Sequence, residues 1–458
     1  AAYMHDLDVE LWKLGIPAKT KHNEVAPAQH ELAPVFDTTN VAVDHNQLTM
    51  EIMKKVADKH DLVCLLHEKP FEGINGSGKH NNWSMITDDG VNLLDPGKTP
   101  SENIQFLVFL MAVIKAVDEY ADLLRISVAS AGNDHRLGAN EAPPAVVSIF
   151  LGDELTEVLK SIENDTYFTS HGAVQMDIGA TVLPHFVKDN TDRNRTSPFA
   201  FTGNKFEFRM LGSAASVANP NIVLNTAVAE ALDQFAKELD GVAPEDMEHA
   251  VHELIKRAIK KHKRVIFNGN GYTDEWIEEA EKRGLYNLKS TPDALPMWIA
   301  QKNIDLFTKH SIFTSEELHS RYEIWLENYS KTINIESNTM VEMVQKDLLP
   351  SVMSYIEEIA STASLKASVV PGITCESETA LITKLSELQD AMTKGLEKLK
   401  SDTAKARATE DVLENAKLYQ AEVLEDMEEL RKSADAAETL IPDDLLPYPT
   451  YGKLLFYI

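Results

Sequence analysis

Apolar and polar positions alternate in two different ways along the chain. Between Ala1 and Asn338, periods typical of strands and of helices are mixed with Gly, Pro and Asn turns, as in α+β or α/β enzyme domains. From Thr339 onward the pattern becomes nearly all helical. We therefore predict an α+β domain over residues 1–338 and a helical extension over residues 339–458.

Two runs in the extension repeat apolar residues at steps of three and four, which is typical of amphipathic helices. The first run is Leu381, Leu385, Leu388, Met392, Leu396 and Leu399. The second run is Val412, Ala416, Tyr419, Val423, Met427 and Leu430. Together they predict an antiparallel helical hairpin, followed by a Pro- and Tyr-rich tail from Pro442. The stripes indicate a core face in preference to a coiled coil for a partner protein.

The first residues read as a helix already under way, which Gly15 and Pro17 end. Because the chain opens at Ala1 in this way and without an initiator Met, we expect a piece of a longer protein. Much further along, a capping box over residues 314–317 predicts a helix that ends near Tyr329.

Charge and cysteine content exclude several classes of protein. The 458 residues include 72 Asp and Glu against 44 Lys and Arg, a net charge of −28. This charge repels phosphate backbones and anionic lipids, so we expect neither nucleic acid nor membrane as a partner. The longest uncharged apolar stretch, Asn103 to Ile114, is too short to span a bilayer. Cys64 and Cys375 support neither a disulfide framework nor a Cys-based zinc site, and we expect a cytoplasmic location.

The first segment with candidate chemistry contains Glu24 and Glu31. Pro27 lies between them and bars a helix interior, so both carboxylates sit on an extended or turning segment. There they could converge on a hard cation such as Mg²⁺. Two solvated surface glutamates are the alternative.

The second segment is rich in glycine. Residues 73–79 match the spacing of a phosphate-binding loop, but His80 stands where that loop needs a Ser or Thr for magnesium. We favour a different interpretation, in which the glycines let the backbone approach a ligand and His80 offers a nitrogen to a metal. A glycine-rich surface turn is the third possibility.

Two further segments carry opposite charges at close spacing. Arg136 suits a phosphate or carboxylate, and Glu141 on the same loop could act as a base or a lid, or the two could form a surface ion pair. In the segment from Lys205 to Met210 the period is two, so Lys205, Glu207 and Arg209 share one face. That strand is either a solvated edge or the floor of a site where an anion and a metal meet.

Taken in this order, the four segments resemble the catalytic half of glutamine synthetase, and most of all its long bacterial type III form. The resemblance covers Lys21 to Pro220 at the level of motifs and continues more weakly from Ser290 to Asn338. It implies an α+β catalytic domain with an antiparallel sheet or split barrel flanked by helices. It also implies Mg²⁺ or Mn²⁺ as cofactor and ATP as co-substrate.

The resemblance implies roles for single residues. Glu24 and Glu31 would hold the metal near the substrate glutamate, and His80 and Glu207 would hold the metal near the ATP phosphates. Glu141 would be the glutamate of the flap that closes the site and accepts a proton from ammonium.

The remaining assignments concern the organic substrates. Asn75 and Gly76 would contact the amino acid, while Arg136 and Arg209 would bind its carboxylates or the phosphorylated intermediate. The transferring phosphoryl group would be stabilised by Arg195. A further pair, Ser84 and Lys205, would lie beside the nucleotide.

The activity so implied is ATP-dependent ligation of ammonia to L-glutamate by a homo-oligomer of stacked rings, a dodecamer. A γ-glutamyl ligase that uses another amine, or a non-catalytic assembly module, are the alternatives. Some positions depart from the family: four residues separate Arg136 from Glu141, one fewer than in the shorter forms, Asn82 replaces a histidine and Ala200 an arginine. The family's upstream glutamate pair and β-grasp domain do not precede Ala1, so we expect this piece alone to be inactive.

Overall fold

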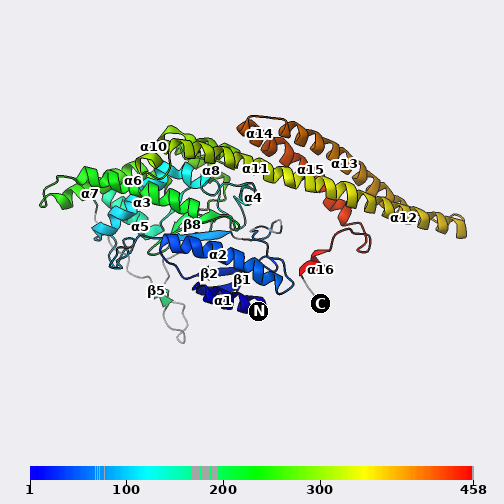
Figure 1. The fold of residues 1–458 in the computed structure, drawn as a ribbon, viewed down its shortest axis with the longest axis horizontal. Coiled ribbons are helices and arrows are strands. Elements are labelled where there is room, and N and C mark those ends of the chain that lie inside the picture. The colour runs from blue at the N-terminus through cyan, green and yellow to red at the C-terminus, as the bar shows by residue number, and fades with distance from the viewer. Residues whose placement is uncertain are drawn as a thin grey trace. The chain divides into compact units, whose positions relative to one another are not determined.

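The fold is described from a computed structural model of the chain (Figure 1). It describes residues 1–67, 69, 71, 73–76, 78–166, 175–176, 186–187 and 194–455. The chain forms two compact units, Ala1–His319 and Ser320–Ile458. This division falls within helix α11 (Ser315–Met343) and therefore earlier than the boundary expected between residues 338 and 339. The functional division at that boundary stays a prediction.

The first unit is built around a four-stranded sheet in the order β3-β8-β7-β4. Its strands are β3 (Lys79–Trp83), β4 (Ile149–Phe150), β7 (Phe199–Phe201) and β8 (Phe206–Leu211). Neighbouring strands are antiparallel except for β4 and β7, which are parallel. All six residues of β8 are buried, so the expectation of a solvated edge for this strand is wrong. A strand that is buried on both faces can contain charged residues when these residues have partners, as Glu207 does with His80.

Two further strand pairs accompany the sheet. Strands β1 (Ala18–Asn23) and β2 (His30–Pro34) pair antiparallel, as do β5 (Gln175–Met176) and β6 (Phe186–Val187). The first hairpin packs through Leu32 against a small core of Leu7, Leu11 and Ile16 and a residue of the second helix. That core joins α1 (Ala2–Lys13) to α2 (Thr39–Asp58).

The longest buried helix of this unit is α3 (Ile104–Ile126), which packs against α6 (Ala218–Leu239) and α7 (Met247–His262). The Asn103 side chain caps it by accepting a hydrogen bond from the amide of Phe106. The smaller helices are α4 (Ala131–Asp134), α5 (Asp153–Glu163), η1 (Lys263–Val265), α8 (Asp274–Lys282), α9 (Thr291–Ala294), η2 (Leu295–Ile299) and α10 (Gln301–Lys309). Among the described residues no helix is long and apolar enough to cross a membrane.

The capping box before α11 is confirmed. The amide of Glu317 donates to Thr314 Oγ1 at 3.2 Å, and Glu317 Oε2 accepts from the amide of Thr314 at 2.8 Å. The helix that follows continues to Met343, so the predicted end near Tyr329 is wrong. Nothing in the sequence after Tyr329 stops a helix, since the next residues include no Gly or Pro.

The second unit is all helical among the residues that the structure describes. Besides its part of α11 it contains η3 (Val344–Leu348), α12 (Leu349–Val369), α13 (Glu376–Arg407), α14 (Val412–Leu418), η4 (Tyr419–Val423), α15 (Leu424–Glu438) and α16 (Tyr451–Leu455). The predicted hairpin is confirmed: α13 runs beside α14 and α15 in Figure 1. Ion pairs of Lys398 with Asp426 and of Lys405 with Glu422 fix its antiparallel direction.

The two apolar stripes meet in this hairpin, with one polar residue among the buried positions. In α13, Leu385 through Leu399 of the predicted run are buried, while Leu381 is half-buried. In the second run Val412 and Met427 are only half-buried, and Leu430 is buried as predicted. Asp426, next to Met427, is buried and pairs with Lys398 of α13. The α+β class with a helical C-terminal region is thus confirmed.

Candidate active site and metal ligands

The hairpin of β1 and β2 brings Glu24 and Glu31 together. His22 and Glu31 are Cα partners across the hairpin, and the amide of Glu24 donates to the carbonyl of Gln29 at 3.0 Å. As a result His22 Nε2 lies 2.7 Å from Glu24 Oε1 and 3.0 Å from Glu31 Oε2. These three side chains offer ligand atoms within 4.8 Å of one another. The two glutamates are half-buried and adjacent, and their role as metal ligands stays a prediction.

His22 was not among the predicted site residues. Its signal in the sequence is the spacing His22-Asn23-Glu24, which puts the imidazole and the carboxylate on one side of an extended segment. Only the pairing of β1 with β2 adds Glu31 to that side.

The two carboxyl groups titrate unequally because they are neighbours. A hydrogen bond with Glu31 lowers the pKa of Glu24, and His22 and His80 act in the same direction. Burial raises the pKa of Glu31, and Glu24 adds to that effect. Two neighbouring carboxyl groups each disfavour the ionised form of the other, and a bound cation would remove that penalty.

His80 and Glu207 meet across the pair of β3 and β8. The register shifts between Lys79 and Asn81, so His80 occupies an irregularity of the strand. Its Nδ1 atom lies 2.9 Å from Glu207 Oε1. A bulge of this kind commonly redirects one side chain next to an active site.

The other ring nitrogen of His80 supports a metal at this place. Nε2 is buried and has no hydrogen-bond partner among the described residues. His80 also lies close enough to Glu24 and Glu31 to favour the ionised form of both. Three carboxylates and an imidazole are a suitable donor set for Mg²⁺ or Mn²⁺. All four predicted metal ligands are thus brought to one region.

Arg136 is buried and held against the backbone of β8. Its Nη2 atom donates to the carbonyls of Leu211 at 2.8 Å and Arg209 at 3.2 Å, and Nε donates to Asn133 Oδ1 at 2.6 Å. Asn133 in turn donates to the carbonyl of Met210 at 2.8 Å. The helix α4 is therefore tied to the sheet just before the loop of Glu141. The surface ion pair expected as an alternative for Arg136 is wrong.

Arg209 lies near two acidic residues, Glu207 and Glu141. Arg209 Nε is 3.9 Å from Glu207 Oε2, and Arg209 Nη1 donates to the carbonyl of Asn194 at 3.1 Å. Burial lowers the pKa of Arg209, while Glu207, Tyr272 and Glu141 oppose that effect. A cation kept charged by surrounding acids in a buried site is suited to bind an anionic substrate.

The loop of Glu141 has a strained backbone. Asn140 and Glu141 both have positive φ, at 50° and 71°, which is uncommon for residues other than glycine. Glu141 Oε1 pairs with Arg195 Nη1 at 2.7 Å, and the Glu141 side chain is 18% exposed against 72% for Arg195. Strain of this kind concentrates at functional loops.

Lys69, which is not among the predicted site residues, connects two loops of the site. Its Nζ atom donates to the carbonyl of Asn140 at 2.5 Å and to that of Ile74 at 3.3 Å. The glycine loop with Asn75 and Gly76 is thereby joined to the loop of Glu141. Asn75 is half-buried and Gly76 buried.

Ser84 and Lys205 lie near each other at the end of the β3–β8 pair. Ser84 Oγ donates to the carbonyl of Asn204, next to Lys205, at 3.0 Å. The interpretation of residues 73–79 as a phosphate-binding loop is wrong, because Lys79 begins strand β3, whereas that loop requires a helix.

The chain is similar to known proteins over most of its length. Residues 1–147 match the family model "Glutamine synthetase, catalytic domain", and residues 250–366 match "Glutamine synthetase C-terminal domain". A glutamine synthetase of Butyrivibrio fibrisolvens is 59% identical over all of this chain and 65% of its own length. A type-3 glutamine synthetase of Dictyostelium discoideum is 46% identical over 99% of this chain and 62% of its own length.

The chain spans about two thirds of the length of these relatives, slightly less in each case. Among solved structures, one described as apo GmaS without ligand covers 72% of this chain and 59% of its own, with TM-score 0.45 and 16% identity. The relatives that match from end to end, one of them a type-3 enzyme, and the two family models lead to one conclusion: the chain belongs to the glutamine synthetase family, in its type III form.

Proposed function

We propose that the full-length polypeptide containing this chain joins ammonia to L-glutamate in an ATP-dependent reaction. The γ-carboxylate takes the terminal phosphoryl group of ATP, and ammonia then displaces phosphate from γ-glutamyl phosphate to give L-glutamine. The observation that carries the proposal is the meeting of Glu24, Glu31, His80 and Glu207 beside Arg209.

The charges of the reactants explain why such a site is needed. A carboxylate and a triphosphate repel each other, so the site must neutralise charge as the phosphoryl group moves. Mg²⁺ or Mn²⁺ supplies that neutralisation when bound. Glu24 and Glu31 would hold the ion nearer the amino acid, and the buried His80 Nε2 with Glu207 would hold the ion nearer the nucleotide.

Cationic and polar side chains complete the proposed substrate sites. Arg209 binds a carboxylate of glutamate or the phosphorylated intermediate, with Asn75 and Gly76 beside the amino acid. Arg136 contributes by holding β8 and α4 in place, and its predicted contact with substrate remains part of the proposal. Ser84 and Lys205 lie beside the nucleotide, while Arg195 stabilises the transferring phosphoryl group.

Glu141 acts as the flap base in this proposal. Its ion pair with Arg195 breaks when Arg195 turns to bind the phosphoryl group. The freed carboxylate of Glu141 then takes a proton from ammonium. A closed flap also keeps water from the acyl phosphate.

The assembly and location are proposed from the family resemblance. We propose a cytoplasmic homo-oligomer of stacked rings, a dodecamer. Mass photometry of the full-length protein tests the subunit number, and a mass corresponding to a monomer or dimer would contradict it.

The decisive experiment compares amines. The full-length protein is assayed with glutamate, ATP and Mg²⁺ and either ammonium, methylamine or a polyamine, and both phosphate and the amide product are measured. We expect phosphate and glutamine in equal amounts, with ammonium preferred by kcat/KM. Preference for an organic amine would support the γ-glutamyl ligase alternative, and no phosphate release would support the assembly module.

A further inference from the structure

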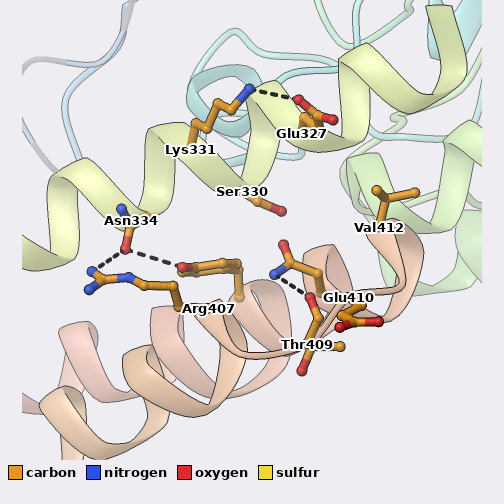
Figure 2. A pocket seen from close by; sticks show the side chains of 10 residues that line it. Glu327, Ser330, Lys331, Asn334, Arg407, Thr409, Glu410 and Val412 are labelled. Atoms are coloured by element: carbon orange, nitrogen blue, oxygen red, sulfur yellow. Dashed lines mark hydrogen bonds and ion pairs between the residues drawn. The ribbon is translucent and has the colours of Figure 1, made fainter. Parts of the chain in front are cut away.

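The helical unit contains a cavity of about 250 Å³ that takes no part in the proposed reaction. It lies where α11 faces the connection between α13 and α14 (Figure 2). Its lining includes Ser330, Asn334, Arg407, Glu410 and Tyr419. The cavity is below the size of most drug-binding pockets and suits a molecule of amino-acid size.

Ser330 is a candidate contact for an occupant of this cavity. Its residue is 7% exposed, and its Oγ atom has no hydrogen-bond partner among the described residues. Hydroxyl groups in a helix usually bond the carbonyl four residues earlier, as Thr332 does on the same helix at 2.9 Å. In Figure 2 the Ser330 hydroxyl lies on the side of α11 that faces Thr409 and Glu410. A buried hydroxyl without a partner is costly unless a ligand satisfies it.

Arg407 provides an oriented positive charge at one end. Its Nη2 atom donates to Asn334 Oδ1 at 2.9 Å and to Asn338 Oδ1 at 3.4 Å. Tyr419 donates to the same oxygen of Asn334 at 3.1 Å, which fixes the amide. Within the described chain Arg407 forms no ion pair. A guanidinium held by neutral amides in a chain of net charge −28 is suited to a carboxylate.

Glu410 provides the opposite charge. It has no ion pair among the described residues, whereas the other charges of the lining, Lys331 and Glu327, neutralise each other at 2.7 Å. Figure 2 shows Arg407 and Glu410 toward opposite ends of the group of lining side chains. Both side chains are exposed, and one charge of each sign, set apart in this way, matches a ligand whose own charges are also separated.

We propose that this cavity binds a small zwitterion whose carboxylate meets Arg407 and whose ammonium group meets Glu410, with Ser330 bonding to the ligand between them. The ligand class is an ω-amino acid or a molecule with the same separation of charges. The site is distinct from the proposed active site, and it does not depend on the proposed function.

The test is calorimetric titration of the full-length protein with γ-aminobutyrate, δ-aminovalerate and ε-aminocaproate. Butyrate and butylamine, which each lack one charge, are the matched probes. We expect saturable binding of one or more of the ω-amino acids and weaker binding of both matched probes. Arg407→Gln and Glu410→Gln should each weaken that binding roughly tenfold or more, since each removes a hydrogen bond between charged groups. Ser330→Ala should weaken it less.

Arg431→Gln is the control, because Arg431 lies in the same unit and pairs with Asp435 at 3.0 Å on the surface. The affinity of this variant for the ω-amino acids should equal that of the unaltered protein. Circular dichroism melting checks that each variant folds. The proposal is overturned if no ω-amino acid binds, if Arg407→Gln binds as tightly as the unaltered protein, or if butyrate binds as tightly as γ-aminobutyrate.

Discussion

Single side chains set the state of the proposed flap. The Glu141 side chain is mostly buried and pairs with Arg195, although its backbone has a φ of 71°. The ion pair is therefore part of what keeps the loop in a strained conformation. Such a carboxylate is positioned to leave the pair when a more negative group reaches Arg195.

We predict that Glu141→Ala in the full-length protein lowers kcat for glutamine synthesis by about 10²-fold or more, because a general base is lost. Affinity for Mn²⁺ and the unfolding midpoint should change little, since Glu141 is outside the proposed metal ligands. Steady-state assays and titration calorimetry measure these quantities. Glu154→Ala, on the exposed side of α5, is the control. An unchanged kcat would remove Glu141 from its proposed role.

Lys69 gives a second prediction at this scale. Its ammonium group joins the carbonyls of Ile74 and Asn140, so Lys69→Met should loosen the flap and let water reach the acyl phosphate. We expect phosphate release to exceed glutamine formation, and kcat/KM to fall roughly tenfold, as for a lost charged hydrogen bond. Lys55→Met, which removes only an exposed pair with Glu51, is the control. Equal amounts of phosphate and glutamine from Lys69→Met would argue against this positioning.

At the scale of elements, the pairing of β3 with β8 depends on a glycine. A Cβ atom added to Gly78 would overlap the carbonyl oxygen of Leu211 and lie 2.9 Å from Arg136 Nη2. Neither neighbour can move easily, because Arg136 is bonded to that same strand.

Gly78→Ala should therefore separate the two strands and destabilise the protein by about 1–3 kcal/mol, the usual cost of overpacking. It should also weaken Mn²⁺ binding, because His80 and Glu207 would move apart. Gly132→Ala is a close control, since a Cβ there meets nothing within 4 Å. Urea unfolding distinguishes the two. Equal midpoints for both variants would refute the argument.

Ion pairs of Lys309 link α10 to α6. Lys309 pairs with Glu230 at 2.6 Å and with Asp233 at 2.7 Å. Hydrogen bonds from Lys237 and Lys309 lower the pKa of Asp233 from its ordinary 3.8 to about 2. Because the folded pKa is the lower one, this contribution to stability is present above 3.8 and is lost as pH falls toward 2.

We predict that Asp233→Asn loses stability relative to the unaltered protein at neutral pH and that the two converge in this acid window. Urea midpoints at several pH values test it. Asp305→Asn on α10, where the carboxylate only accepts from Gln301, should run parallel to the unaltered protein. A constant difference between Asp233→Asn and the unaltered protein down to pH 2 would contradict the assignment.

For the whole molecule, 72 acidic residues stand against 44 basic ones, a net charge of −28. We expect repulsion among the acidic residues to be the main electrostatic contribution to its stability. Raising NaCl from low to physiological concentration should raise the first thermal midpoint by several degrees, because salt screens charges beyond about 8–10 Å. Scanning calorimetry measures the midpoint, and KCl in place of NaCl separates ionic strength from binding of one ion. A midpoint that falls with salt would mean that attractive pairs dominate.

The elements of the fold were largely readable from the sequence. Steps of three and four define α13, and the capping box defines the start of α11, because helices obey rules between near neighbours. The prediction that Met427 is buried was wrong, because its neighbour Asp426 takes the buried position and pairs with Lys398 of α13. That pair lies between distant segments, so no local period reveals it.

The sequence by itself determined which segments are candidates for chemistry, and the roles proposed for Glu24, Glu31, His80 and Glu207 follow from the resemblance to the family. Only the tertiary structure decided their partners. His22 joins Glu31 through strand register, and Lys69 meets Asn140 across 71 positions of the chain. Arg136 is likewise held by a strand more than seventy residues later. Contacts between distant segments depend on the path of the whole backbone, and no local pattern of side chains encodes that path.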